Sequence, residues 1–457
     1  MRRIAHLVVA ASVLGLGPDA FLQARDGDGE APGRTPAGGL LLQDLIPLSA
    51  GGMMQGTPPA ETASTVAPAQ APSILKSWTI KGWAEVSYTW NGNQPADSKN
   101  STSYDPYSST RAFKENSFRV FDTNHNEFML NSVALDVAKE ATDDSWVGFR
   151  VLALVGQDAK WLHAAGLFDQ GTGPVSGEGA DFDLPDAYIS LKVPEKVLPW
   201  ATTLRIGKWE TTHGAEVLMP SANINFSKSY LFGYAIPISH TGVDLSSTIL
   251  KRPNDSEMVG VGLGVVNGWD NVKDNNDSLS YMGQVRFQPC NEFKTSTEVM
   301  FGPELDGNNH DWRGLVDIIA TVYAWGPLEG LEVTGNYDYG WEDGTSIGYA
   351  TWYGFAGYLK YKLARIEALK KWYLGFRGEW FDDHDGVRTV WAGAGGQNFG
   401  GQSVVGLTGT LGFQPCENLL MRFEVRYDKA DDEVFNKEKE DFSNHQTTVA
   451  VDLVMTF

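Results

Sequence analysis

The sequence predicts an all-β protein, a transmembrane antiparallel β-barrel of about 16 strands that occupies residues 77–457. Apolar and polar residues alternate with a period of two through most of this region, as expected for strands with one apolar face. The connections between these segments are alternately short and long. After residue 20 no run of 18 apolar residues occurs, which excludes a bundle of transmembrane helices.

Composition agrees with a β-rich membrane protein and excludes several other classes. The chain holds 50 Gly, 15 Trp, 16 Tyr and 22 Phe, although only 42% of its residues are hydrophobic. Its net charge of −21 argues against a nucleic-acid partner, because phosphate contacts require clustered Lys and Arg. Two Cys cannot form a disulfide scaffold, and neither has metal-ligand spacing to another Cys or His. We therefore expect no metal and no cofactor.

The N-terminus has the layout of a secretory signal peptide, assigned to residues 1–24. Arg2 and Arg3 precede an apolar stretch from Leu7 to Leu16 that is too short to span a bilayer. An N-terminal core helix is the alternative interpretation. Residues 25–76 are rich in Ala, Pro, Gly, Ser and Thr, so they predict a flexible spacer that cannot bury enough apolar surface to fold.

The barrel itself is predicted from the alternating segments taken in order. Between Trp78 and Trp90, and again between Thr447 and Phe457, most apolar side chains occupy every second position. Most segments have about the length that a tilted strand needs to cross the membrane. The predicted strands are 77–90, 128–140, 145–155, 184–193, 203–210, 240–250, 258–267, 278–288, 293–302, 313–325, 331–342, 350–361, 371–381, 402–414, 419–429 and 445–457.

Alternating connection lengths predict the orientation of the barrel. Antiparallel strands deliver successive connections to opposite rims, so short periplasmic turns gather at one end and long outer loops at the other. The even strand number then places both barrel ends on the periplasmic side. The short series is 141–144, 194–202, 251–257, 289–292, 326–330, 362–370 and 415–418, and the longer series is 91–127, 156–183, 211–239, 268–277, 303–312, 343–349, 382–401 and 430–444.

The charged faces of the strands are predicted to line a water-filled lumen. Aromatic residues concentrate near strand ends, as at a membrane boundary, and a barrel of this width is too wide for its own side chains to fill. The alternative role of the charged groups is a salt-bridge ladder that makes the barrel rigid. The candidate pore-lining residues are Lys81, Glu85, Arg205, Arg286, Glu298, Asp338, Arg377, Glu379, Arg422, Glu424 and Arg426.

One long connection, 211–239, is unusually apolar for an outer loop. It contains Phe226, Tyr230 and Phe232, whose exposure to solvent would be unfavourable. We therefore expect this loop to fold into the lumen as a constriction. Packing against a neighbouring copy is the alternative, so a homo-oligomer is left open.

A tetrapeptide, Phe-Gln-Pro-Cys, occurs twice, at Phe287–Cys290 and at Phe413–Cys416. Each copy closes a predicted strand at a short turn. Six strands separate the two turns, so the cysteines are expected to lie on the order of 30 Å apart. A disulfide needs Cα atoms within about 7 Å, so both thiols are predicted to be free.

Several ordered motifs resemble the OmpL-like β-barrel porin family of diderm bacteria, over residues 77–457. The resemblance implies an outer-membrane channel for small solutes and carries no agreed substrate residues. The motifs are Arg205–Trp209 with Gly214–Glu216, Asn223–Tyr230, His240–Val243, Val265–Asp270 and Arg422–Asp428.

The leading functional hypothesis is passive diffusion of small hydrophilic solutes or ions through a barrel embedded in outer-membrane lipid, without catalysis. Net negative rims predict a weak preference for cations. One alternative is an adhesion or binding role for the acidic loops 382–385 and 431–441. A barrel hydrolase using His240, Asp244 and Ser246 is disfavoured, because same-face neighbours on a strand lie about 7 Å apart. A secreted protein that binds sugars through its Trp residues is a further alternative.

Overall fold

The computed structural model describes residues 78–95, 116–142, 144–168, 181–389, 401–438 and 441–457. The predicted signal peptide and spacer therefore lie outside the described residues, as do parts of several long connections. None of the helices in the described ranges has the length and apolar character needed to cross a bilayer.

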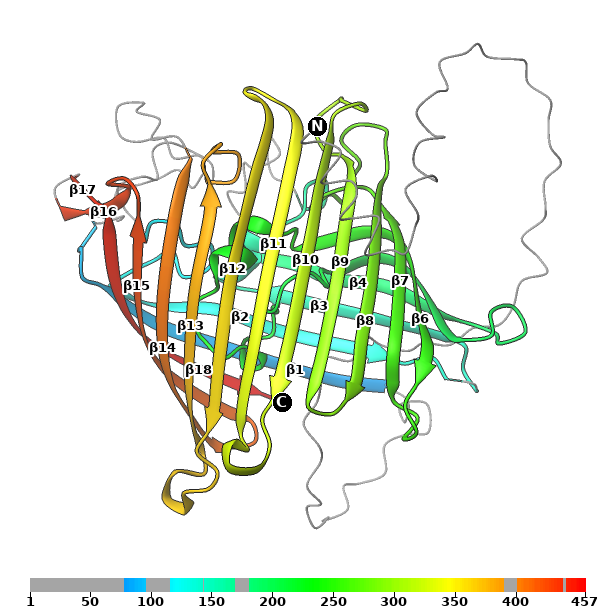
Figure 1. The fold of residues 1–457 in the computed structure, drawn as a ribbon, viewed down its shortest axis with the longest axis horizontal. Helices are drawn as coiled ribbons and strands as arrows, with labels where there is room; N and C mark the ends of the chain where they lie inside the picture. Colours follow the sequence, from blue (N-terminus) through cyan, green and yellow to red (C-terminus); the bar gives the residue numbers. More distant parts are fainter. Residues whose placement is uncertain (1–77, 96–115, 143, 169–180, 390–400, 439–440) are drawn as a thin grey trace. The chain divides into compact units, whose positions relative to one another are not determined.

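Sixteen antiparallel strands form one closed barrel, as the alternating sequence pattern predicts (Figure 1). Each strand pairs with its neighbours in chain order, and β1 pairs with β18 to close the sheet. The barrel strands are β1 (Trp78–Asn91), β2 (Glu127–Lys139), β3 (Val147–Val155), β4 (Phe182–Val193), β5 (Ala201–Glu210), β6 (Ser239–Lys251), β7 (Glu257–Val266), β8 (Ser280–Cys290), β9 (Phe293–Pro303), β10 (Trp312–Tyr323), β11 (Leu331–Thr345), β12 (Gly348–Lys362), β13 (Trp372–Asp383), β14 (Gln402–Cys416), β15 (Leu419–Ala430) and β18 (His445–Thr456).

The seam between the first and last strands is a regular ladder. It runs from the pair Trp83–Thr456 to the pair Asn91–Thr448. Gly82 and Phe457 exchange two backbone hydrogen bonds, each 3.0 Å long. A Cβ atom at Gly82 would lie 2.2 Å from the carbonyl oxygen of Ala134, so only glycine fits between these strands. The closed seam leaves no free edge of the barrel sheet.

The two rims differ as predicted, with one exception. The short turns lie at the lower end of Figure 1, beside the C-terminus. The connection predicted at 343–349 is wrong, because β11 continues to Thr345 and β12 begins at Gly348. Gly344 and Gly348 have φ values of 74° and 88°, which lets the chain reverse within a tight hairpin. The sequence prediction treated these turn residues as a loop.

The apolar face of each strand points outward and the charged face points inward. Ile80 and Met455 are 58% and 52% exposed, whereas Asp317 and Arg426 are completely buried. A soluble barrel would show the reverse arrangement, with apolar side chains inside. The outer surface therefore matches lipid.

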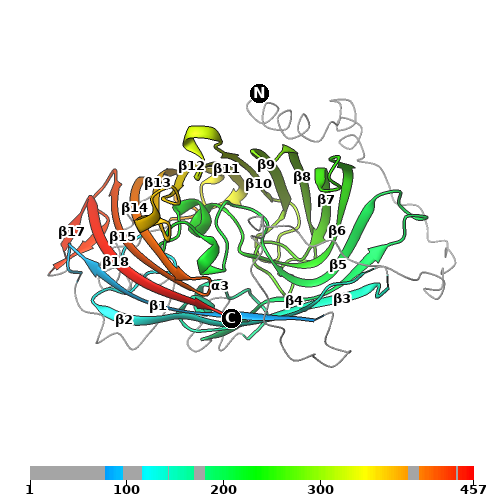
Figure 2. The same ribbon diagram turned by 90° about the horizontal axis from the view of Figure 1, so that it is seen from below.

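Connections from the long-loop rim fill part of the lumen, which the strand pattern did not predict (Figure 2). The short helix α3 (Gln157–Leu162) packs against β2, β3 and β4, over the inward-facing Leu152 and Leu154. Residues 116–123 are also largely buried. A small hairpin, β16 (Phe435–Lys437) with β17 (Asp441–Ser443), lies in the connection before β18. The sequence predicts that one connection, 211–239, enters the water-filled lumen, and it gives no such prediction for residues 116–123 or α3.

Both cysteines are free, as predicted, and both are exposed. Each follows an irregularity in the strand register, between Phe287 and Cys290 in β8 and between Phe413 and Cys416 in β14. The repeated tetrapeptide therefore forms the same bulged turn twice on the short-turn rim.

Candidate functional site

The connection from Thr211 to Ile238, here called the inner loop, enters the lumen between β5 and β6 (Figure 2). Phe226, Tyr230 and Phe232 are all buried there, on the inside of the barrel. Between β5 and β6 the inner loop forms turns and no strand. Pro220 begins a short 3-10 turn, and Leu231–Ala235 forms a single π-helical turn.

Carboxylates on the barrel wall accept hydrogen bonds from the inner-loop backbone. Glu424 accepts from the backbone nitrogens of Phe226, at 2.8 Å, and of Ser227, at 3.2 Å. Glu379 accepts from the backbone nitrogen of Tyr230 at 2.6 Å. The Tyr230 hydroxyl donates to Asp428, also at 2.6 Å. Two of the predicted pore-lining residues, Glu379 and Glu424, therefore bind the loop.

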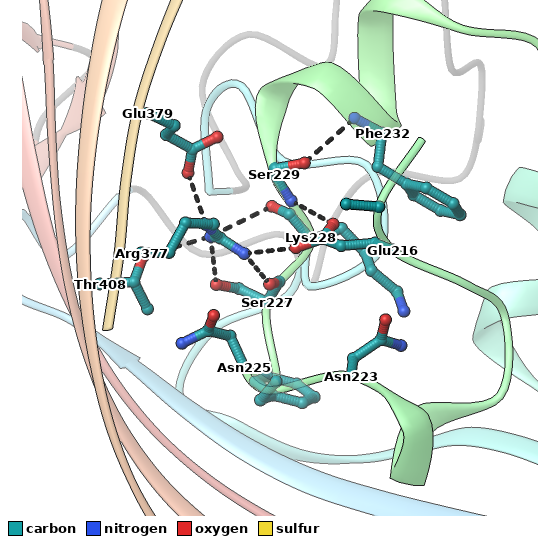
Figure 3. Close-up of polar contacts among 12 residues, drawn as sticks. Glu216, Asn223, Asn225, Ser227, Lys228, Ser229, Phe232, Arg377, Glu379 and Thr408 are labelled. Carbon is teal, nitrogen blue, oxygen red and sulfur yellow. Dashed lines mark hydrogen bonds and ion pairs between the residues drawn. The ribbon is translucent and has the colours of Figure 1, made fainter. Parts of the chain in front are cut away.

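Arg377 is fully buried between β13 and the inner loop (Figure 3). Its guanidinium lies 2.8 Å from Glu216 of the loop and 2.9 Å from Glu379 of its own strand, and it donates to the Ser227 carbonyl at 2.5 Å. These three contacts use the N–H groups that a planar guanidinium presents in a fixed, fork-like arrangement. Arg377 consequently joins the loop to the wall.

Two further arginines bind loop carbonyls in the same way. Arg422 donates to the carbonyl oxygens of Pro220, Asn223 and Asn225 at 2.9–3.1 Å. Arg426 donates to the carbonyl oxygen of Lys228 at 2.7 Å. Both arginines are buried, so these predicted pore-lining groups contact the loop and not open lumen.

Three carboxylates lie side by side where the loop begins. Glu298, Asp317 and Asp338 are direct cross-strand neighbours on β9, β10 and β11, and all are buried. The Thr212 hydroxyl donates to Glu298 at 2.5 Å, and the backbone nitrogen of Gly214 donates to Asp317. Negative charges on directly opposite residues repel one another. The hydrogen bonds donated by the inner loop help to stabilise these carboxylates.

The side of the barrel formed by β5–β8 carries charged groups that are only partly covered. The side chains of Arg205 and Arg286 are 14% and 21% exposed. Arg205 pairs with Asp244 at 2.8 Å and Arg286 with Glu257 at 2.8 Å. This side of the lumen is therefore lined by nearly neutral ion pairs.

Two other charged residues, on β3 and β1, lie on the neighbouring part of the barrel wall. Arg150, which the sequence analysis missed because 145–155 alternates poorly, pairs with Asp136 at 2.9 Å and with Asp186 at 2.8 Å. Lys81 lies at the start of β1, is half exposed and lies 3.3 Å from Asp136.

Two small cavities flank the inner loop and share Leu218. The first, here called the lysine cavity, and the second, the glutamate cavity, each have a volume of about 10 Å³, which is room for little more than one water molecule. The lysine cavity is lined by Glu85, Phe121, Asp122, Asn131, Asp158, Leu218, Pro220, Phe226 and Lys228. The glutamate cavity is lined by Glu210, Thr211, Glu216, Val217, Leu218, Phe232 and Ile238.

Burial changes the protonation behaviour of the loop groups. Burial lowers the pKa of Lys228, and the carboxylates of Glu216, Glu85 and Asp158 act against that shift. Burial raises the pKa of Asp158 in α3 to about 7, and Lys228 opposes this change. Burial lowers the pKa of His213 to about 3, so this histidine is neutral near pH 7. Sequence reasoning missed Lys228 and Asp158 because neither lies in a periodic segment.

The residues of the hydrolase alternative have separate partners. His240 is buried and its Nε2 lies 3.0 Å from the Thr211 hydroxyl. Asp244 binds Arg205, and Ser246 accepts a hydrogen bond from Arg286 at 3.1 Å. The Ser246 hydroxyl therefore has Arg286, and not His240, as its partner, so these three residues do not form a serine–histidine–aspartate arrangement.

A family model described as "Putative beta-barrel porin-2, OmpL-like" matches residues 77–457. The chain belongs to this family. Membership and the closed barrel together imply a porin-type channel of the bacterial outer membrane that passes solutes. No curated protein matches the sequence.

Solved structures with a similar fold are remote in sequence. The anion-selective porin from Comamonas acidovorans is 9% identical, with 83% of this chain and 99% of that chain covered and a TM-score of 0.53. OmpT of Vibrio cholerae is 9% identical, covering 83% and 97%, with a TM-score of 0.47. The channel DcaP of Acinetobacter baumannii is 11% identical, covering 83% and 97%, with a TM-score of 0.45. The first likeness supports the barrel fold.

Proposed function

We propose that this porin passes small hydrophilic solutes and ions by passive diffusion, with a weak preference for cations. The observation that supports this most directly is the closed barrel whose lipid-matched exterior surrounds charged side chains. The inner loop contacts the wall from β9 to β15, and α3 packs on β2–β4, so we expect diffusion along the side lined by β5–β8. Arg205 and Arg286, each paired with a carboxylate, belong to the wall of that path.

The cation preference is proposed from the charges beside the inner loop. The two cavities are lined by five carboxylates, those of Glu85, Asp122, Asp158, Glu210 and Glu216, but by a single ammonium group, that of Lys228. On the side that the inner loop leaves open, the charges of Arg205 and Arg286 are nearly cancelled by those of their carboxylate partners. The chain as a whole carries a net charge of −21, and an excess of carboxylates at the rims and beside the inner loop attracts cations. The preference is weak because several of these carboxylates have arginine partners.

Single-channel recording of the refolded protein in a planar bilayer tests this proposal. We expect stepwise conductance in KCl and, under a KCl gradient, a reversal potential of the sign that indicates cation permeation. A strong preference for anions would contradict the selectivity, and the absence of any conductance would contradict the channel.

We also propose roles for the two N-terminal segments. Residues 1–24 act as a signal peptide and residues 25–76 as a spacer that ends at the periplasmic rim. Membrane fractionation and N-terminal sequencing of the mature protein test both assignments. A mature chain that still begins at Met1, or that is soluble without detergent, would contradict them.

A further inference from the structure

The side chain of Arg286 reaches across a neighbouring strand on the open side of the barrel. It starts on β8, and β6, β7 and β8 lie side by side (Figure 1). Its Nε and Nη2 donate to the two carboxylate oxygens of Glu257 on β7, at 2.8 and 3.0 Å. Nη2 also donates to the Ser246 hydroxyl on β6 at 3.1 Å. The guanidinium therefore lies across β7, against the wall of the proposed path.

Gly260 is the residue of β7 that lies beneath this guanidinium. It is the direct cross-strand partner of Arg286. A Cβ atom at position 260 would lie 2.4 Å from Nη2 of Arg286 and 2.4 Å from a carboxylate oxygen of Glu257. Nonbonded heavy atoms are in favourable contact only at about 3.5 Å or more, so these distances are far too short. The ion pair can therefore occupy this place only because residue 260 has no side chain.

The atoms that a side chain at position 260 would displace are the ends of two long, flexible side chains. Those of Arg286 and Glu257 are 21% and 30% exposed. Gly260 does not have a positive φ, so alanine fits its backbone conformation. A methyl group can therefore be accommodated by turning Arg286 away from the wall, while β7 stays paired with β8. The turned guanidinium would leave Ser246 and project into the path.

We propose that Gly260 is a positioning residue that determines the selectivity of the path, because it lets Arg286 lie on the wall beside Glu257. The proposal rests on the proposed channel function and names a determinant of the width and charge of its path. While the guanidinium lies on the wall, the adjacent carboxylate cancels most of its effect on a passing ion. Turned into the path, the same charge would repel cations, attract anions and narrow the opening.

Reversal potentials under a KCl gradient test the role of Gly260 in selectivity. G260A should lower the permeability ratio of potassium to chloride by about threefold, which is the effect of one unit charge in water about 7 Å from the passing ion. G262A is the matched control on the same strand. The nearest atoms to a Cβ there belong to Gln284 and Leu245, at 3.3 Å or more, so this variant should keep the wild-type ratio.

Removal of Arg286 separates its displacement from a general effect of the added methyl group. R286A should raise the potassium-to-chloride ratio, because it leaves the Glu257 carboxylate with its hydrogen bond from Thr248 but without its cation. The double variant G260A/R286A should match R286A. Liposome swelling with an uncharged pentose reports the width alone, and there G260A should slow entry whereas G260A/R286A should restore it.

Chemical modification in detergent tests the position of Arg286 without any measurement of conductance. Phenylglyoxal reacts with accessible guanidinium groups, and mass spectrometry of the peptides gives the extent of reaction at each arginine. Arg365, which is 48% exposed at the short-turn rim, is the internal reference. Relative to Arg365, Arg286 should react faster in G260A than in the wild type or in G262A. G260S adds a Cβ atom at the same position and should reproduce these changes, so the test does not depend on the folding of one variant.

Each outcome of these experiments has a separate meaning. Equal modification of Arg286 in the wild type and in G260A would overturn the positioning role. Faster modification in a conducting G260A with an unchanged permeability ratio would overturn the role in selectivity and leave the channel standing. Faster modification together with a wild type that shows no conductance would overturn the proposed channel and leave the positioning of Arg286 standing.

Discussion

At the scale of single residues, Arg377 is expected to be essential for seating the inner loop. Its replacement by alanine leaves Glu216 without its buried arginine partner and leaves Glu379 with Arg426 alone. Breaking a buried ion pair in this way costs about 3–5 kcal/mol. We therefore expect R377A to lower the free energy of unfolding by that amount and to add gating noise to the single-channel current.

Arg365 is the matched control for this variant. Its side chain is 48% exposed at the short-turn rim and pairs with Glu329 at 3.2 Å. R365A should change the free energy of unfolding by less than about 1 kcal/mol, because exposed pairs contribute little. Equal effects of R365A and R377A in denaturant titrations would contradict the anchoring role of Arg377.

The pKa of Asp158 predicts a pH-dependent selectivity. Burial raises this pKa from 3.8 to about 7, while Lys228 lowers it and Asp122 raises it further. Below pH 7 the carboxyl is protonated and neutral, so the cation preference should weaken as the pH falls from 8 to 6. Reversal potentials across this range measure the change. D158N should show the weakened preference at every pH and no step near 7.

The raised pKa of Asp158 also makes the free energy of unfolding depend on pH. The folded-state pKa lies above the unfolded value, so the folded chain binds more protons between these two values. Ionising Asp158 therefore reduces the free energy of unfolding as the pH rises from about 4 to about 7. Above pH 7 the reduction is complete and this contribution no longer changes.

Residue faces in the strands were predictable, but their partners were not. Alternation alone places Arg422 and Glu424 on the inward side, because the side-chain period of a strand is two. It cannot reveal that Arg422 binds carbonyl oxygens about 200 positions away in the chain. Lys228 and Asp158 gave no usable signal, since a loop and a six-residue helix have no long period to detect.

At the scale of elements, the inner loop is expected to limit conductance. Deleting Phe226–Ile236 removes the segment that packs on β12–β15 and should enlarge the single-channel conductance. The guanidinium groups that it covers, such as Arg426, would then line open water. Removing residues 343–349 from the outer β11–β12 hairpin is the control, because that hairpin lies at the rim (Figure 1), and its loss should leave conductance unchanged.

An unchanged conductance after the inner-loop deletion would contradict the constriction. It would point instead to a role of this loop in contacts between copies of the chain. Measuring the mass of the detergent-solubilised protein with and without the loop distinguishes these outcomes.

The strands were the elements best predicted from sequence, and the short inserted elements were the least. Sixteen segments, most of them with a clean period of two, define the wall, because one face must meet lipid and the other must not. The hairpin between β11 and β12 was misassigned because Gly344 and Gly348 are read equally well as loop residues. Helix α3 and the β16–β17 hairpin are stabilised by contacts from distant segments, which no local pattern records.

At the scale of the whole molecule, the closed barrel and the inward folding of the apolar loop 211–239 could be predicted, but the filling of the lumen by other segments could not. The width argument counts only wall side chains, and on that basis the interior of a sixteen-strand barrel must hold water. The structure adds residues 116–123, α3 and the inner loop to one side of that interior. Their apolar residues, including Phe121 and Phe232, contact each other at a ring distance of 5.7 Å. The apolar residues of 211–239 predicted the inward folding of that loop, whereas the strand pattern gives no signal for the inward folding of residues 116–123 and α3.

The orientation of the barrel gives a prediction for the whole molecule in the membrane. The exposed thiols of Cys290 and Cys416 both lie on the short-turn rim, which the alternation of loop lengths assigns to the periplasm. A maleimide too large to cross the outer membrane should therefore leave intact cells unlabelled and should label both thiols after the membrane is permeabilised. In a C290S/C416S background, S346C places one thiol on the exposed β11–β12 turn of the opposite rim. This variant should react in intact cells, because its thiol faces the external medium. The reverse labelling pattern would show that the barrel is inserted with its short turns outward, and the proposed path from outside to periplasm would then be inverted.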